Sequence, residues 1–351
     1  MAFATPTGKA AQVLTAMGNK NAFTIHRLLY KWFPTNEDGS GFRRKRISPL
    51  QYKLVICDEV SMIDLEMINE LLSHHECHII FVGDPFQLPS VSKESGEYLL
   101  KEPHVFLSEI MRQELESDII RLSMEVREGK SLSRFIGKDA QVIGKNDVID
   151  GMLTWADQVI CAKNDTRKAF NQKINALKGF SNETVQDGQK IIFLRNYWEE
   201  ISEEGEPVVN GTIGFLDDVK FVRRRIAPRA GGGYIDCVKC NVITENQDIY
   251  YDMYLDFNQL LTGERTITDP KILYKINSFY KSKWAKGHEL VNPIPMEAEL
   301  GWAITCHKAQ GSTFEKVFVL EENFPFEREE HQRWVYTAAT RPSSRLVLVQ
   351  K

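Results

Sequence analysis

The sequence lacks the features that mark membrane, secreted or zinc-binding proteins. None of its apolar runs approaches the roughly 20 residues that a membrane-spanning helix needs. The first residues, MAFATPTGKAA, contain no charged segment followed by an apolar one, so we expect no signal peptide. The 6 cysteines are scattered, and only Cys237 and Cys240 form a CxxC pair. Because no second Cys or His pair accompanies it at zinc spacing, we predict that this pair fills a strand. Cys57, Cys161 and Cys306 lie within or beside apolar runs, which suits reduced core thiols in a cytoplasmic protein.

Excess positive charge is also absent. The net charge is −4 and the isoelectric point is about 6.1, which excludes nucleic-acid binding through overall charge alone. Two local runs of Arg and Lys, at residues 43–46 and 223–225, depart from this average, although such runs commonly form solvated faces. The 351 residues predict two or three domains.

A phosphate-binding loop of the form GxxxxGK[ST] is missing from the sequence. Such a loop cradles phosphates with its backbone N–H groups and meets Mg²⁺ with its hydroxyl. Gly8-Lys9 has Phe3 in place of the first glycine and Ala10 in place of the hydroxyl residue. Gly129-Lys130-Ser131 has Met124 at the first position and follows a helical pattern instead of a strand. We therefore expect no Walker A loop in these residues.

What the chain does contain is a pair of acids at the end of an apolar run. Residues 54–57 (LVIC) predict a buried strand, and Asp58 and Glu59 follow it directly. In open α/β sheets, ligands bind at the carboxyl ends of the strands. One carboxylate there can hold Mg²⁺, and its neighbour can activate water, which is the Walker B arrangement of nucleoside triphosphatases. The alternative is a strand that ends in two solvated acids.

The rest of the chain alternates between predicted helices and strands. The helices are expected at 65–73, 118–128 and 165–177, and the strands at 78–84, 158–164, 190–194, 316–320 and 345–349. Turn residues between Trp32 and the basic run at 43–46 predict a hairpin excursion within 30–50. Short β-like runs predict a β-rich insertion over 216–292. The pattern gives an α/β fold with domains at 1–150, at 151–215 with 293–351, and at 216–292.

Seven segments in a fixed order resemble the motifs of superfamily 1 DNA helicases, closest to the RecD-like branch that includes the phage Dda helicase. They are ATPTGKAA (4–11), TIHRLL (24–29), LVICDEVSMID (54–64), FVGDPFQLPSV (81–91), LSEIMRQ (107–113), AITCHKAQGSTF (303–314) and VYTAATR (335–341). The resemblance implies two RecA-like parallel-sheet domains, the first without its Walker A strand and loop. It also implies an SH3-like β-rich insertion and a strand-separating hairpin, with Trp32 or Phe33 as the wedge unless these two pack in the core.

The same resemblance assigns roles around ATP and Mg²⁺. Asp58 would bind Mg²⁺, Glu59 would activate water, and Gln87 would sense the γ-phosphate. Arg112 and Arg341 would act as arginine fingers, although surface salt bridges are the alternative. Gln310 and Gly311 would lie near the nucleotide.

Single-stranded DNA is the other partner that the resemblance implies. The residues expected to face it are Thr5, Pro6, Thr7, Thr305, His307 and Lys308. His307 could equally be a packed core histidine.

The expected function is therefore an ATP-dependent DNA helicase that moves 5′ to 3′ in the cytoplasm of a bacterium or of a phage-infected cell. Because the Walker A loop is missing, we expect a truncated, misannotated, split or degenerate form that is nearly inactive alone. A separate polypeptide could supply the loop. The alternative is a non-catalytic single-stranded-DNA-binding or interaction protein derived from a helicase. Another motor with two RecA-like domains would leave CHKAQGST and VYTAATR unexplained.

Overall fold

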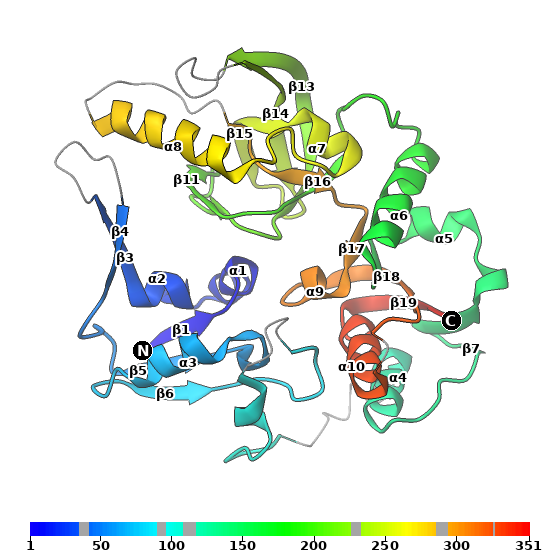
Figure 1. Cartoon of the computed structure of the whole chain (residues 1–351). Coiled ribbons are helices and arrows are strands. Elements are labelled where there is room, and N and C mark those ends of the chain that lie inside the picture. The colour runs from blue at the N-terminus through cyan, green and yellow to red at the C-terminus, as the bar shows by residue number, and fades with distance from the viewer. Residues whose placement is uncertain (35–41, 90–95, 108–116, 226–232, 286–293, 326) are drawn as a thin grey trace. The chain divides into compact units, whose positions relative to one another are not determined.

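The computed structural model describes residues 1–34, 42–89, 96–107, 117–225, 233–285, 294–325 and 327–351. The chain divides into two compact units (Figure 1). The first consists of Met1–His26, Pro49–Gly179 and Trp302–Lys351, and the second of Arg27–Ser48 and Phe180–Gly301. In the described part of the chain, no helix is long and apolar enough to cross a membrane.

The first unit contains a four-stranded parallel sheet, which we call the first sheet. In spatial order its strands are β2 (Ala22–Thr24), β1 (Ala2–Thr5), β5 (Leu54–Cys57) and β6 (His78–Phe81). Helix α1 (Gly8–Ala16) follows β1, and α3 (Leu65–Leu72) follows β5. Burial of apolar side chains such as Val55 and Ile68, both 0% exposed, stabilises this half.

Side-chain caps fix where both helices begin. The Thr7 hydroxyl accepts a hydrogen bond from the Ala10 N–H at 3.3 Å, and the Asp64 carboxylate accepts one from the Met67 N–H at 2.8 Å. Each cap satisfies a backbone donor that has no partner inside its helix. A strand, a turn and a helix thus follow one another directly at the start of the chain.

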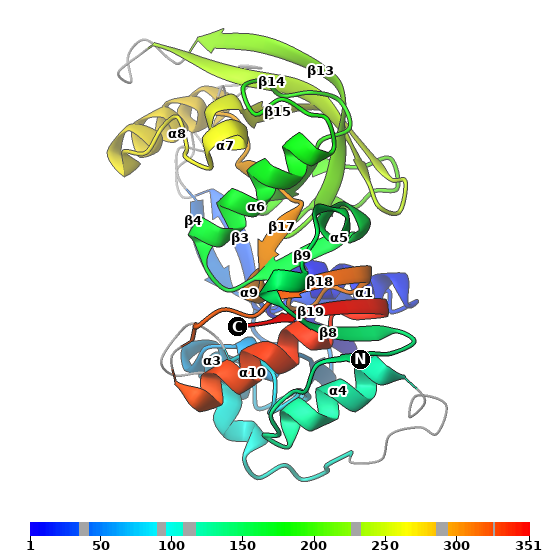
Figure 2. The same ribbon diagram turned by 90° about the vertical axis from the view of Figure 1, so that its right-hand side faces the viewer.

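A six-stranded second sheet completes the first unit. Its order is β17 (Ala303–Thr305), β9 (Gln158–Cys161), β18 (Phe314–Leu320), β19 (Pro342–Gln350), β8 (Ala140–Gly144) and β7 (Phe135–Ile136). All pairs are parallel except that of β7 with β8. The helices of this half are α4 (Asp118–Arg127), α5 (Asp150–Trp155), α6 (Asn164–Leu177), α9 (Cys306–Ala309) and α10 (Arg328–Ala339). Figure 2 shows α4 alongside α10.

The second unit is built on an antiparallel sheet. Its order is β15 (Ile249–Asp256), β14 (Tyr234–Thr244), β13 (Ile213–Arg225), β10 (Lys190–Phe193) and β16 (Ala298–Leu300). Its core includes Phe193, Val242 and Leu255. The other elements that it includes are β3 (Tyr30–Pro34), β4 (Phe42–Arg46), β11 (Tyr197–Ile201), β12 (Pro207–Val208), α7 (Phe257–Thr262) and α8 (Pro270–Ala285). Helix α2 (Ile25–Leu29) spans the boundary between the two units.

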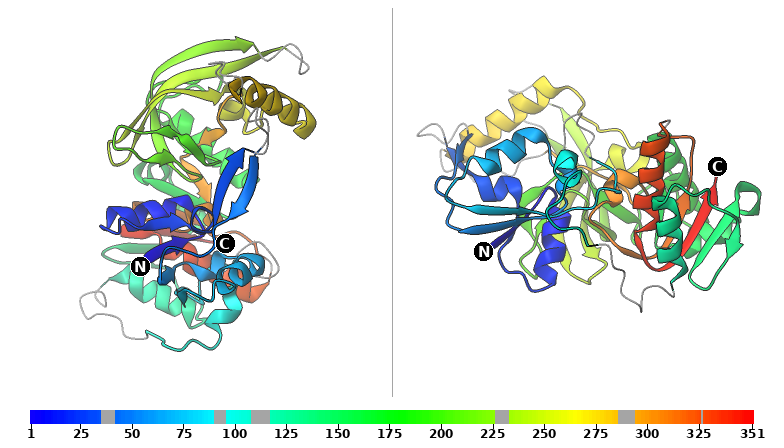
Figure 3. Two further views of the ribbon diagram at one scale, coloured as in Figure 1. Left: turned by 90° about the vertical axis from the view of Figure 1, so that its left-hand side faces the viewer. Right: turned by 90° about the horizontal axis from the view of Figure 1, so that it is seen from below.

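Antiparallel pairing of β3 with β4 confirms that a hairpin is present; it is the pair of blue arrows in the left panel of Figure 3. The tip of this hairpin, residues 35–41, and the side chains of Trp32 and Phe33 lie outside the described part, so the wedge remains a prediction.

Sheet pairing groups some strands differently from the predicted domain ranges. Strand β8 lies within 1–150 but pairs with β19 of the second sheet. Strand β10 lies within 151–215 but pairs antiparallel with β13 and β16, because its neighbours are strands of the β-rich unit. The helix α8 within the insertion was not predicted, and the SH3-like character of the insertion stays a prediction.

All 6 cysteines are buried and free, so the expectation that Cys57, Cys161 and Cys306 are core thiols is confirmed. Cys237 and Cys240 lie within β14, as predicted for a pair that fills a strand. No group of three or more potential metal ligands from His, Cys, Asp and Glu occurs among the described residues.

We predict that Gly96→Ala destabilises the turn that follows β5. A methyl group at Gly96 would lie 2.3 Å from the Val60 carbonyl oxygen and 2.8 Å from Ile68 Cδ1, so backbone must shift. Such overpacking typically costs about 1–3 kcal/mol, measurable as a lower Tm by circular dichroism. Gly151→Ala is the matched control, since its nearest neighbour atom would be 3.9 Å away. Equal Tm values for the two variants would contradict the packing described at Gly96.

Candidate nucleotide site

The first sheet brings its acidic residues to one edge. Parallel strands place their carboxyl ends together, so Asp58 and Glu59 after β5 lie beside Asp84 after β6. Backbone hydrogen bonds fix this edge: Asp58 N–H donates to the Ala4 carbonyl at 2.9 Å and Val60 N–H to the Val82 carbonyl at 3.0 Å.

Glu59 is held in a strained conformation between these strands. Its φ of 56° is left-handed, a region that costs non-glycine residues of order 1–3 kcal/mol. Its N–H donates to Asp58 Oδ1 at 2.8 Å. Strain at this position is consistent with a functional constraint on the Glu59 side chain.

The charges that act on Glu59 come from residues of both sheets. Burial raises the pKa of Glu59, the charge of Asp58 raises it further, Arg341 lowers it, and Asp84 adds a smaller increase. The competing carboxylates would be stabilised by a divalent cation, and Mg²⁺ needs only one or two protein carboxylates when phosphates complete its shell. The residues at this edge therefore fit Mg²⁺, with Asp58 as the expected ligand.

Arg341 approaches from the end of α10. It is only 8% exposed and donates from Nε to the Thr337 carbonyl at 2.9 Å, from Nη2 to Thr340 Oγ1 at 2.9 Å and from Nη1 to the Ser312 carbonyl at 3.4 Å. It makes no salt bridge to a carboxylate among the described residues, so the alternative of a surface salt bridge does not describe it. Its charge is available to a negative group.

Gln87 lies in the loop that leaves β6. Its amide oxygen is buried and has no hydrogen-bond partner in the part of the chain that the structure describes. The residue after it, Leu88, donates its N–H to Thr337 Oγ1 and accepts from Gln310 Nε2, both at 2.8 Å. Gln310 thus holds the Gln87 loop.

Gly311 packs against the start of α1. A methyl group there would lie 3.3 Å from Ala10 Cβ and 3.6 Å from the Thr7 hydroxyl, and its φ is +71°. Gly311, which is predicted to lie near the nucleotide, is therefore close to Thr7, which is predicted to face DNA.

The residues predicted to face DNA differ in accessibility. Thr5 is 0% exposed and donates its hydroxyl to the Thr7 carbonyl at 2.9 Å, so it shapes the turn. Pro6 and Thr7 are partly exposed, as are Thr305, His307 and Lys308 at the start of α9. Burial lowers the pKa of His307, which favours the neutral imidazole. The DNA contacts stay predictions, and Arg112 lies outside the described residues.

Sequence reasoning assigned no role to Tyr336 or Thr337, although both lie inside VYTAATR. The Tyr336 hydroxyl donates to Asp84 Oδ2 at 2.7 Å, and Thr337 is 0% exposed. The available signal in the sequence was that both residues lie inside the motif that ends in the candidate arginine finger, Arg341.

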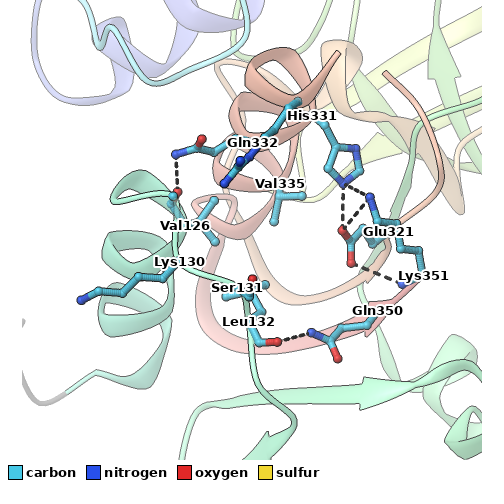
Figure 4. A pocket seen from close by; sticks show the side chains of 12 residues that line it. Val126, Lys130, Ser131, Leu132, Glu321, His331, Gln332, Val335, Gln350 and Lys351 are labelled. Atoms are coloured by element: carbon cyan, nitrogen blue, oxygen red, sulfur yellow. Dashed lines mark hydrogen bonds and ion pairs between the residues drawn. The ribbon is translucent and has the colours of Figure 1, made fainter. Parts of the chain in front are cut away.

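A separate pocket of about 410 Å³ lies between the end of α4, α10 and the ends of β18 and β19 (Figure 4). Its charged groups largely satisfy one another: His331 Nε2 lies 2.8 Å from Glu321 Oε1, and Lys351 Nζ lies 4.0 Å from the same oxygen. Burial works to raise the pKa of Glu321, but these partners hold it below its ordinary value. None of the predicted site residues lines this pocket.

Two largely parallel sheets, with carboxylates after the strands of one and a buried arginine before a strand of the other, are consistent with two RecA-like domains. The chain matches the family model of an AAA domain over residues 1–147 and that of a UvrD-like helicase C-terminal domain over residues 300–349. These models cover the segments that carry the acids and Arg341.

Individual relatives point the same way. The chain is 24% identical over 386 residues to the ATP-dependent DNA helicase dda of Enterobacteria phage T4, covering 96% of this chain and 85% of that one. It is 33% identical over 132 residues to the ATP-dependent RecD2 DNA helicase of Deinococcus radiodurans, covering 36% of this chain and 17% of that protein.

Among solved structures, a Pif1 helicase from Bacteroides, crystallised with ADP-AlF3 and single-stranded DNA, shares the fold. Its TM-score is 0.50 at 19% identity, and the match covers 99% of this chain and 82% of that one. The chain is thus a relative of superfamily 1 helicases of the RecD, Pif1 and Dda type, and both the predicted resemblance and the two-domain α/β fold class are confirmed.

We predict that Glu59→Gln stabilises the chain at high pH. Because the folded-state pKa of Glu59 is raised above 4.5, the folded state retains a proton that the unfolded state loses, so ionised Glu59 destabilises the fold as pH rises above about 4.5. The glutamine variant avoids this loss. Its Tm should match the wild type near pH 4.5 and exceed it at pH 8, whereas exposed Glu102→Gln should show no such divergence. A Tm difference that is constant with pH would contradict the shifted pKa.

Proposed function

We propose that the chain is the motor portion of an ATP-driven, Mg²⁺-dependent DNA helicase that translocates 5′ to 3′ on single-stranded DNA. The observation that carries this proposal is that the carboxylates after β5 and β6 lie near the segment that ends in buried Arg341: Tyr336 of α10 donates to Asp84 at 2.7 Å, and Arg341 directly follows that helix. Phosphoryl transfer needs a metal, an oriented water and positive charge at the transferred group. In this proposal Asp58 binds the metal, Glu59 orients the water, and Arg341 supplies the positive charge.

The remaining requirement is a group that holds the β- and γ-phosphates. The sequence contains no GxxxxGK[ST] loop. Strand β6 is an edge of the first sheet, and two apolar side chains there are exposed: Ile80 in the strand at 49% and Val82 directly after it at 44%. Parallel sheets normally have both faces covered, and an exposed edge can pair with another strand. We propose that β6 receives a strand that leads into a phosphate-binding loop, from the same or a separate polypeptide.

A non-catalytic single-stranded-DNA-binding protein is the second candidate function. It is favoured by the missing phosphate loop, because the polar residues of α9 can bind DNA without ATP hydrolysis. Hydrolysis measurements separate the two candidates.

We predict that the 351-residue chain alone hydrolyses ATP at a rate near background, since positioning supplies most of the catalysis of phosphoryl transfer. Supplying a strand followed by GxxxxGK[ST], fused ahead of residue 1 or added as a separate chain, should produce hydrolysis that depends on single-stranded DNA. Rapid DNA-stimulated hydrolysis by the unsupplemented chain would overturn this account of the site. No activity with any supplied loop would favour the binding-protein candidate.

In the chain supplied with a phosphate-binding loop, Asp58→Ala should abolish ATP hydrolysis. Arg341→Ala should reduce its rate by roughly 10³–10⁵, the range measured for arginine fingers. Arg341→Lys retains the charge but loses the planar fork, so it separates charge from geometry. Arg333→Ala on the same helix, which removes an ion pair with Glu97 at 2.8 Å, is the control that should retain activity.

DNA binding is tested independently of ATP. Lys308→Ala and His307→Ala should weaken binding to single-stranded DNA, and loss of one phosphate contact at Lys308 should reduce the salt slope by about 1. Fluorescence anisotropy with a labelled oligonucleotide measures both effects, and surface Lys173→Ala is the matched control. Equal affinity for duplex and single strand, unchanged by either variant, would contradict the DNA assignment.

A further inference from the structure

Helix α10 holds the Gln87 loop at two points. The first is Asp84, where the loop begins: its Oδ2 accepts the Tyr336 hydroxyl at 2.7 Å, while its Oδ1 accepts the Phe86 N–H at 2.9 Å. One carboxylate therefore bonds both to its own loop and to a helix of the second half. Burial and the bond to Asp84 raise the pKa of Tyr336, so its hydroxyl remains a donor at neutral pH.

The second point is Leu88, directly after Gln87. Its N–H donates to Thr337 Oγ1 at 2.8 Å, and Leu88 and Thr337 are 3% and 0% exposed. Water cannot replace this acceptor at a site so buried, and an unsatisfied buried N–H is destabilising. Gln87 thus lies between two hydrogen-bonded residues, Asp84 and Leu88, whose partners Tyr336 and Thr337 are neighbours in α10.

Thr337 also contacts Arg341. Its carbonyl accepts the Arg341 Nε–H at 2.9 Å, so one residue bonds to the Gln87 loop through its side chain and to Arg341 through its backbone. Arg341 lies just beyond the end of α10, and this hydrogen bond back to Thr337 links its position to that of the loop.

We propose that Tyr336 and Thr337 are positioning residues that keep Gln87 in register with Arg341, so that both reach the transferred phosphate together. The inference rests on the proposed function for its catalytic consequence, but the anchoring itself can be measured without nucleotide. Thr337 is the stronger test, because valine removes its hydroxyl at nearly constant shape and serine retains it.

The first experiment is hydrogen exchange in the 351-residue chain. Between Pro85 and Pro89, the only three residues are Phe86, Gln87 and Leu88, so this segment has three backbone amides. Thr337→Val should speed exchange at Leu88 about tenfold, as expected for loss of a buried hydrogen bond, while Thr337→Ser stays near the wild type. The control is Thr154→Val, at a partly exposed position of α5. Unchanged exchange in Thr337→Val, or equal acceleration by valine and serine, would overturn the anchoring.

The second experiment uses the form supplied with a phosphate-binding loop. Thr337→Val and Tyr336→Phe should each lower kcat about tenfold or more with KM for ATP within about twofold, since misplacement of groups affects the transition state. Thr337→Ser should restore kcat. In a Gln87→Ala background, Thr337→Val should have no further effect, because it acts through Gln87.

The outcomes of the two experiments are separable. If the supplied wild type shows no hydrolysis, the proposed function fails and hydrogen exchange alone decides the anchoring. If hydrolysis is present but the effects of Thr337→Val and Gln87→Ala multiply, Thr337 does not act through Gln87 and the proposal is overturned.

Discussion

The site depends on three carboxylates that two parallel strands place at one partly buried edge of the first sheet. The charges of Asp58 and Asp84 both raise the pKa of Glu59, and each of the three side chains is accommodated differently. Asp58 accepts the Glu59 N–H, Asp84 accepts the Tyr336 hydroxyl, and Glu59 is left with a raised pKa that only Arg341 opposes. The fold therefore maintains an excess of negative charge that a divalent cation would neutralise, at the cost of stability when that cation is absent.

The sequence predicted this edge well because its signals are local. An apolar run that ends in acids specifies a buried strand and its polar exit, and Thr7 and Asp64 are caps that can be read from neighbouring residues. Contacts between residues that are distant in the sequence were harder to predict. The sequence shows that VYTAATR ends in an arginine, but not that Thr337 faces Leu88, which is 249 positions away. Likewise, strand β10 has an apolar pattern that suits a parallel or an antiparallel neighbour, so its place in the β-rich sheet depended on its partners.

Contacts within the β-rich unit change the interpretation of the basic run at residues 223–225. Arg223 in β13 donates to Asp236 in the neighbouring strand at 2.7 Å, and Lys239 lies 2.7 Å from Asp252. Arg224 lies over the ring of Tyr254, 4.1 Å from its centroid. Two of these cations are thus offset by neighbouring acids, which reduces the positive potential that the sequence suggests. Arg224 makes no salt bridge to any carboxylate among the described residues and is the best placed of the three to meet a phosphate.

The connection between the two sheets is partly polar. At the Gln87 loop it includes discrete hydrogen bonds, in which Tyr336, Thr337 and Gln310 bond to Asp84 and Leu88, together with an edge contact between the rings of Phe86 and Tyr336. A hydrogen bond of this kind contributes a net of about 0.5–1.5 kcal/mol, so a few of them can be broken and remade as a ligand binds. A large apolar interface would instead resist separation in proportion to its area. Gln310 follows His307 and Lys308 by only a few residues, so a strand held by α9 would pull on the same loop that positions Gln87. Nucleotide and DNA would then bias one shared set of polar contacts, and neither would need to act through the apolar core of either sheet.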